Sequence, residues 1–306
     1  MTNLVKLSVT LSLIFSINNV YADREAFEST YVPLAPEKIV IQNASIYDGD
    51  GGEFFETDVL VEDGKIIAIG KDLPFSNEFR VIDATGKWVT PGIIDIHSHM
   101  GVYPAPGVRT SSDGNEATSP VTADVWAEHS IWVQDPQYAL ALTGGVTAFH
   151  ILPGSANLIG GRGVTVKNLQ RVTINSMKFP DAPHSLKMAC GENPKRVYGN
   201  RGQAPSTRMG NAAGYRKSWI QAEGYLRRLN EYEEKSDEAK ELEYAPTRDL
   251  EMETLAGVLK GEILVHNHCY RADEMATMID IAKEFNYKIT AFHHGVEAYK
   301  IADLLA

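Results

Sequence analysis

Hydrophobic residues occur in runs of four or five along residues 38–90, and polar turn residues separate the runs. Two of the turns contain an Asp-Gly pair, Asp48-Gly49 and Asp63-Gly64. Short strands joined by such turns are typical of all-β structure. The pattern therefore predicts a small N-terminal β-sandwich domain over residues 38–90. Its predicted strands include residues 38–41, 58–61, 66–70 and 79–83.

From residue 91 the pattern changes to strands that alternate with helices, which favours an α/β fold with a parallel sheet. Helix spacing is clear at Met275 and Met278, and residues 249–260 show it again. The charged residues 221–243 predict a solvated helix or helical hairpin. Six strands are predicted, at residues 92–99, 146–152, 164–168, 185–190, 263–268 and 288–294.

This order of elements predicts a (β/α)8 barrel, a TIM-like fold that takes about 250 residues and carries its catalytic groups at the carboxyl ends of the strands. Residues 91–306 are fewer than that and provide six strand candidates. The sequence therefore predicts an incomplete barrel that lacks its last strands. Exposed core along the open edge would favour aggregation or a homo-oligomer.

The first 22 residues have the layout of a secretory signal, with one lysine, an apolar run and a small-residue ending. An interior helix is the alternative, but the abrupt change to charged residues 23–25 argues against it. We expect cleavage of residues 1–22, a leader over residues 23–37, and a periplasmic or secreted protein. The only cysteines, Cys190 and Cys269, could then form one disulfide or stay as two free thiols.

Composition narrows the function classes. Hydrophobic residues at 43% and charged residues at 23% are ordinary globular values, which excludes disorder, collagen and coiled coil. A formal net charge of −11 without a basic stretch argues against a nucleic-acid partner. The chain has no apolar run of about 18 residues, so no membrane span is expected after signal cleavage. A small-molecule substrate is the expected partner.

The sharpest chemical signal is an Asp-x-His-x-His pattern on the first predicted barrel strand. Residues two apart on a strand point to one face, so Asp95, His97 and His99 share a face. Two neutral imidazoles this close suit zinc or a related divalent ion. The alternative is a pair of ordinary half-buried histidines, because HxH alone is a weak motif.

Two further predicted strands also end in histidine. The fifth ends in His266 and His268, and the sixth ends in His293 and His294. Because His293 and His294 are adjacent, we expect them on opposite faces, with at most one at the barrel mouth. The other histidines, His129, His150 and His184, have no such pattern and are expected to be structural or at the rim.

The fourth predicted strand carries a lysine. If Leu186 and Met188 face the helices, Lys187 faces the barrel interior, where an unpaired ammonium is costly. A Lys187 carbamylated by CO2 would be an anionic ligand able to bridge two metals. Glu192 offers an unmodified carboxylate for the same role, and an ion pair between Lys187 and Asp95 is the structural alternative.

Several spaced motifs together resemble the metal-dependent amidohydrolase superfamily, over a span from about residue 38 to the end. Three of them are DATGK from Asp83, VTPGIIDIHSH from Val89 and GGVTA from Gly144. The remaining motifs look like the imidazolonepropionase-related branch of the superfamily. These are LKM from Leu186, GENPKR from Gly191, HCYRAD from His268 and HGVE from His294.

The resemblance implies one or two divalent metal ions, with zinc the expected ion. The implied ligands are His97, His99, Lys187 or Glu192, His268 and His294, with His266 as a substitute for His268. The general base of the family is an aspartate at the eighth strand. That strand would lie beyond Ala306, so no residue here takes the role.

Three functions are compatible with this pattern. The first is a metal-activated-water hydrolase of a C–N bond in an amide, cyclic amide or dipeptide-like substrate. The second is a metal-dependent deaminase of a ring or amidine, and the third is a non-catalytic barrel that at most binds metal. Asn157 and Arg162, on the Gly-rich stretch after the second strand, and Arg271 are candidate substrate-binding residues, although that stretch could be a simple connector.

Overall fold

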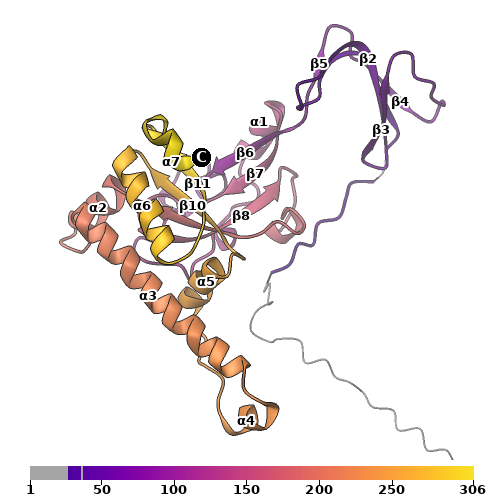
Figure 1. Ribbon diagram of the computed structural model, residues 1–306. Coiled ribbons are helices and arrows are strands. Elements are labelled where there is room, and N and C mark those ends of the chain that lie inside the picture. Colours follow the sequence, from indigo (N-terminus) through magenta and orange to yellow (C-terminus); the bar gives the residue numbers. More distant parts are fainter. Residues whose placement is uncertain (1–26, 36) are drawn as a thin grey trace, which may run out of the picture.

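The computed structural model describes residues 27–35 and 37–306, so the expected signal peptide lies outside the described residues. Figure 1 shows a small sheet that stands apart from a larger α/β unit; the long helix α3 lies along the larger unit, and its far end extends beyond it together with α4. Of the helices in the described chain, none is long and apolar enough to cross a membrane.

The small unit is one five-stranded sheet in which β3, β2, β1 and β4 are adjacent in that order and β5 pairs with β1. Asp63 and Gly64 both have positive φ, as the two-residue turn between β2 and β3 requires. The all-β character is as predicted, while a second layer that would make a sandwich stays a prediction. The strands are β1 (Ile39–Tyr47), β2 (Glu53–Glu62), β3 (Lys65–Gly70), β4 (Arg80–Asp83) and β5 (Trp88–Val89).

The larger unit contains a six-stranded barrel-like sheet, so the α/β prediction is confirmed at this level. Neighbouring strands follow one another from β6 to β11 without a crossover in strand order. The six strands are β6 (Ile93–Ser98), β7 (Val146–Ile151), β8 (Ile159–Lys167), β9 (Ser185–Ala189), β10 (Leu264–Cys269) and β11 (Ile289–His294).

One strand differs from the parallel sheet expected from the sequence. β8 begins at Ile159 instead of Val164 and runs antiparallel to both β7 and β9. Only residues 152–158 separate β7 from β8, and a parallel crossover needs about a dozen residues or more. Glycine at position 161 allows β8 to begin this early, because the Cβ of any other residue would lie 2.3 Å from the Val125 carbonyl oxygen.

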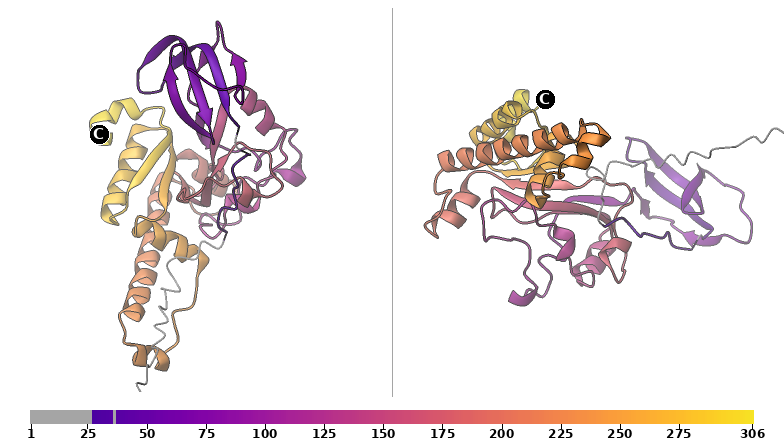
Figure 2. Two further views of the ribbon diagram at one scale, coloured as in Figure 1. Left: turned by 90° about the vertical axis from the view of Figure 1, so that its right-hand side faces the viewer. Right: turned by 90° about the horizontal axis from the view of Figure 1, so that it is seen from below.

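Helices cover the outer face of β9 and β10 (Figure 2, right). Leu186 and Met188 pack in one core with Trp219 of α3 and Leu255 of α5. Burial of each such side chain contributes about 1.5–3 kcal/mol. The helices are α1 (Gln137–Thr143), α2 (Glu192–Gly199), α3 (Arg208–Glu233), α4 (Asp237–Leu242), α5 (Leu250–Leu259), α6 (Ala272–Glu284) and α7 (Ala302–Leu305). The helices predicted at residues 221–243, 249–260 and around Met275 are therefore confirmed.

Thr207 fixes the start of α3, and its loss is expected to cost about 1 kcal/mol of unfolding free energy. Its hydroxyl accepts a hydrogen bond from the Gly210 amide at 3.0 Å, which would otherwise be unpaired at the helix start. Urea unfolding of Thr207→Ala measures the effect. Thr207→Ser keeps the oxygen and should stay close to wild type, so equal losses in both variants would contradict the capping role.

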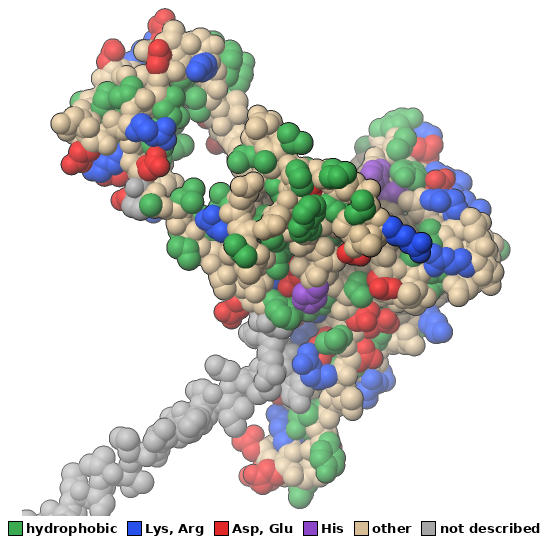
Figure 3. Space-filling model, turned by 180° about the vertical axis from the view of Figure 1, so that it is seen from behind, with side chains coloured by type: hydrophobic (Ala, Val, Ile, Leu, Met, Phe, Trp, Pro, Cys, Tyr) green, Lys and Arg blue, Asp and Glu red, His purple; other side chains and the backbone are tan. Residues whose placement is uncertain are grey.

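The strands at the two ends of the larger sheet, β6 and β11, each have one paired neighbour. On β6 the side chains of Ile94 and Ile96 are 62% and 60% exposed. They alternate with Asp95 and His97, which therefore point to the other face. Figure 3, the view from behind, shows hydrophobic side chains gathered on the surface of the larger unit. The inner face of β6 is thus left for the histidines.

Candidate metal centre

Four histidines meet at the carboxyl ends of β6, β10 and β11. Nε2 of His97 and Nε2 of His99 are 3.3 Å apart. The ring of His294 lies 4.8 Å from that of His97 and 4.5 Å from that of His268. The structure thus brings together the four histidines that the sequence proposed as metal ligands.

His293 belongs to the same group, contrary to the expectation that only one of the adjacent pair would reach the mouth. Its ring lies 4.5 Å from His97. The reason is the backbone of His294, which has φ +67°. Strand alternation ends at this left-handed residue, so both rings turn toward His97.

Below this group the histidines continue into the barrel interior. Nδ1 of His266 and Nε2 of His293 are 2.8 Å apart, and the His150 ring is 4.6 Å from that of His266. The sequence assigned His150 a structural or rim position, and it is buried inside the barrel, where its two ring nitrogens contact the Thr165 and Ser185 hydroxyls at 2.9 and 2.7 Å. Its neighbours Phe149 and Ile151 lie in the outer core, and this alternation was the available signal.

Lys187 lies fully buried beside these rings. Its ammonium donates to the Pro153 carbonyl at 2.8 Å. The ion pair with Asp95 that the sequence offered as an alternative is not formed: Asp95 instead accepts from the His97 amide at 3.0 Å. Glu192, the other bridging candidate, is exposed at the start of α2. The geometry favours Lys187 over Glu192.

Burial keeps these histidines neutral at ordinary pH. It lowers the pKa of His97 to about 2, with the Lys187 charge as the next cause. Burial lowers the pKa of His268 to about 3, assisted by His294 and Lys187, and the pKa of His99 is lowered as well. A neutral imidazole retains one lone pair, which is the form that binds metal.

Similarity to known proteins shows which family the chain belongs to, although no family model matches it. The structure of an amidohydrolase from Thermotoga maritima superposes with a TM-score of 0.80 and 40% sequence identity. The match covers 88% of this chain and 67% of that chain. The chain belongs to the amidohydrolase family.

Two curated relatives agree with this amidohydrolase assignment. Amidohydrolase tasK of Hapsidospora irregularis is 36% identical over 275 residues, which are 84% of this chain. A dihydroorotase of Lactobacillus helveticus is 46% identical over 74 residues, 24% of this chain. The chain spans 28% of the tasK relative and 16% of the dihydroorotase. The narrower imidazolonepropionase-related placement stays a prediction.

The donor atoms of this amidohydrolase fit a divalent metal, with limited side-chain movement. Within residues 27–35 and 37–306, no three His, Cys, Asp or Glu side chains are arranged to hold an ion as they stand. Two nitrogens of a tetrahedral zinc, however, are about 3.3 Å apart, which matches the His97–His99 spacing. Nδ1 of His99 donates to the Leu152 carbonyl at 2.8 Å, so its Nε2 presents the lone pair. Nδ1 of His97 is buried without a hydrogen-bond partner among the described residues.

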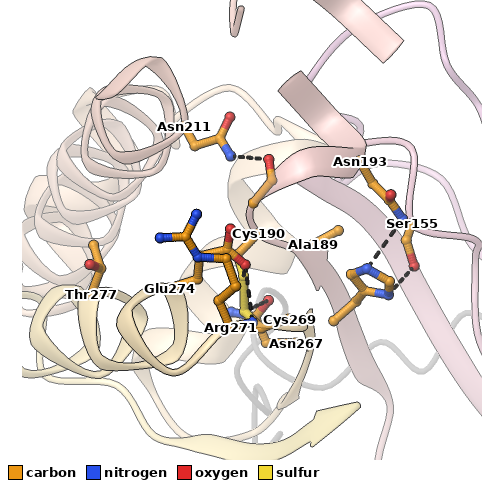
Figure 4. The surroundings of a disulfide bond; sticks show 12 residues. Ser155, Ala189, Cys190, Asn193, Asn211, Asn267, Cys269, Arg271, Glu274 and Thr277 are labelled. Atoms are coloured by element: carbon orange, nitrogen blue, oxygen red, sulfur yellow. Dashed lines mark hydrogen bonds between the residues drawn. A yellow bond between two sulfur atoms is a disulfide. The ribbon is translucent and has the colours of Figure 1, made fainter. Parts of the chain in front are cut away.

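His268 is held on both sides of its ring, as the dashed lines in Figure 4 show. Its Nδ1 lies 3.0 Å from the Ser155 hydroxyl, and its Nε2 lies 3.2 Å from the Asn193 amide nitrogen. Neither contact was foreseen from the sequence, because Ser155 lies in the turn between β7 and β8 and Asn193 in the first turn of α2, both distant from His268 along the chain. Whichever nitrogen meets a metal, the other keeps a partner that fixes the ring.

The three proposed substrate-binding residues lie apart from the histidines. The Asn157 amide donates to the Glu116 and Ser119 carbonyls and to Thr122 Oγ1, so it stabilises the loop that contains residues 116–122. Arg162 pairs in register with Leu186 and therefore lies on the face opposite Lys187. It bonds Thr254 at 2.8 Å and covers the Trp126 ring. Arg271 pairs with Asp273 at the start of α6. Substrate binding by these residues stays a prediction.

The other two histidines expected to lie outside the metal site, His129 and His184, contact the same tryptophan near the start of β9. The His184 ring lies 5.1 Å from Trp126, and the His129 ring stacks on the same indole at 5.5 Å. Because His184 precedes the first residue of β9, it is at the amino end of the strand, away from the metal-ligand candidates. Its expected structural role agrees with this position.

Proposed function

We propose that the protein hydrolyses an amide or cyclic amide C–N bond with one or two divalent metal ions, zinc being the expected ion. The observation that carries the proposal is the convergence of His97, His99, His268 and His294 beside buried Lys187. Similarity to an amidohydrolase at 40% identity supports the reaction class. Export to the periplasm or medium, expected from residues 1–22, is part of the proposal.

When bound, such a metal lowers the pKa of a coordinated water toward about 7 and polarises the carbonyl of the substrate. His97, His99, His268 and His294 would supply the neutral nitrogen donors. The Leu152 carbonyl fixes the His99 ring, so that Nε2 presents its lone pair before any ligand arrives.

Lys187 would contribute either the positive charge of its ammonium or, once carbamylated, an oxygen ligand for the metal. Burial lowers the pKa of Lys187 to about 7, so a large fraction of the amine is neutral at that pH. A neutral amine can add CO2, forming an N–C bond and releasing one proton, and the resulting carbamate is an anionic oxygen donor. Glu192 is exposed and would have to approach from the α2 side.

The test is metal content together with a substrate panel. Elemental mass spectrometry of the purified protein should find about one or two zinc-like ions per chain. Cyclic amides, N-acyl amino acids and dipeptides should then be screened for C–N cleavage, before and after chelator treatment. The matches to dihydroorotases support including the cyclic amides. Ammonia release without ring or chain cleavage would indicate a deaminase instead, and neither metal nor turnover would leave a non-catalytic barrel.

A further inference from the structure

A disulfide joins the carboxyl ends of two barrel strands next to the metal-ligand candidates. Cys190, which follows β9, is bonded to Cys269, the last residue of β10 (Figure 4). Both cysteines are buried. Cys269 directly follows His268, and Cys190 comes three residues before Asn193. The bond therefore joins the two short segments that carry the Asn193–His268 contact.

That contact selects one form of the His268 ring. The amide nitrogen of Asn193 can only donate, so Nε2 of His268, 3.2 Å away, must accept. The ring proton then sits on Nδ1 and is donated to the Ser155 hydroxyl at 3.0 Å. A single tautomer and a single ring orientation follow from the two contacts.

The β9 side of the disulfide is fixed independently by the helices behind it. Asn211 of α3 donates to the Gly191 carbonyl at 2.8 Å. Glu274 of α6 forms an ion pair with Arg208 at 2.6 Å, and its carboxylate packs against Gly191. A Cβ at position 191 would lie 2.4 Å from that carboxylate. Figure 4 shows Asn211 and Glu274 on this side of the cysteines. The disulfide connects this fixed point to the residue after His268.

Backbone bonds keep the two strands together without the disulfide. The Cys190 amide donates to the His268 carbonyl at 2.8 Å, and β9 pairs with β10 in register from Ser185 beside Leu264 to Ala189 beside His268. Breaking the S–S bond would therefore leave the sheet intact. What it would release is the spacing between the Asn193 side chain and the His268 ring.

We propose that the Cys190–Cys269 disulfide is a redox-responsive clamp that holds His268 in register with Asn193. The clamp rests on the proposed function in one respect, namely that His268 is a metal ligand. A dithiol reductant would supply two electrons and two protons, so the S–S bond breaks, two cysteine thiols form, and the reductant becomes a disulfide. Because the Asn193 amide occupies the Nε2 lone pair that a metal would take, loss of the clamp should raise metal affinity about tenfold, the effect of removing one competing hydrogen bond.

The chain offers a clean experiment because it contains only two cysteines, so a reductant can act on this bond alone. Four proteins are compared: wild type and Asn193→Ala, each with and without the Cys190→Ser and Cys269→Ser pair. Wild type is also measured after treatment with a small dithiol, with free thiols counted. Metal affinity is read by chelator competition with zinc. The ring tautomer of His268 is read by imidazole nitrogen NMR of metal-free protein.

The expected result is non-additive. Removing the disulfide should raise zinc affinity about tenfold and mix the His268 tautomers in wild type, yet change little once Asn193 is alanine. Equal changes in both backgrounds, or a loss of affinity in wild type, would overturn the clamp, because the bond would then act through general stability. A bond that resists the dithiol in the folded protein would overturn its redox response.

The NMR readout separates this idea from the proposed function. If wild type binds no zinc, the proposed function fails, while the tautomer of the metal-free ring still decides whether the disulfide positions His268. A single His268 tautomer that persists without the disulfide would overturn the clamp even in a protein that binds zinc well.

Discussion

Replacing His97 and His99 together with alanine is expected to abolish metal uptake and C–N hydrolysis. Their Nε2 atoms are 3.3 Å apart, which is the spacing of two nitrogen ligands on one tetrahedral zinc. Removing both leaves His268 and His294, too few donors for a stable tetrahedral site. Elemental mass spectrometry and the hydrolysis assay measure the two losses on the same sample.

His184→Ala is the matched control for this double variant. It also removes an imidazole, but one that contacts Trp126 at the amino end of β9. Metal content and turnover should stay within about twofold of wild type, as for a change outside the site. Full activity in the His97/His99 variant would refute the ligand assignment. An equal loss in the His184 variant would show that the functional groups are not confined to the carboxyl ends of the strands.

Lys187→Met is expected to reduce hydrolysis more than about 100-fold, since it removes either a bridging ligand or the ammonium that is buried beside the histidines. Glu192→Gln is the control, and because Glu192 is exposed we expect turnover close to wild type. The opposite ranking, with Glu192→Gln inactive and Lys187→Met active, would make Glu192 the bridging group.

The same lysine predicts a pH dependence of stability in chelator-treated protein. Burial lowers the folded pKa of Lys187 to about 7 from 10.5. Between these values the unfolded chain binds the proton and the folded chain does not, so the free energy of unfolding rises with pH. The gain in unfolding free energy, about 5 kcal/mol for this shift in the pKa of Lys187, builds up as pH rises from about 7 to the unfolded value and is absent below about pH 7.

Urea unfolding at about pH 6 and about pH 9 tests this dependence. Wild type should be markedly more stable at the higher pH, whereas Lys187→Met should lack this part of the difference. At the lower pH the Lys187→Met variant should have a higher free energy of unfolding than wild type, because it no longer buries a protonated amine. An identical pH dependence in both proteins would contradict the assignment to Lys187.

Local patterns in the sequence were sufficient for much of the site. Strand alternation placed His97 with His99, and Lys187 opposite Leu186, because side-chain direction on a strand depends only on parity. Helix spacing likewise located α6 around Met275. These features are determined by neighbours within a few residues.

The features that sequence reasoning missed depend on distant or backbone-specific contacts. The direction of β8 follows from the length of residues 152–158, which depends on where the strand begins. The meeting of His293 and His294 with His97 depends on one positive φ. The disulfide joins cysteines 79 residues apart; the predicted order of strands allowed it, but the sequence left open whether the two thiols are bonded or free.

The reversed direction of β8 also affects which parts of the barrel can vary. In a regular (β/α)8 barrel the connection between successive strands is a helix that can lengthen or shift outside the sheet. Here a strand occupies that place, so the wall gains one strand spacing, about 4.8 Å of circumference. At the mouth of the barrel β7 and β8 are joined by the hairpin turn 152–158. A hydrogen bond from the Gly154 amide to the Gly114 carbonyl, at 2.7 Å, fixes this turn. Diversification among relatives would therefore concentrate in the longer segments 99–136 and 190–249, while this part of the mouth keeps its width.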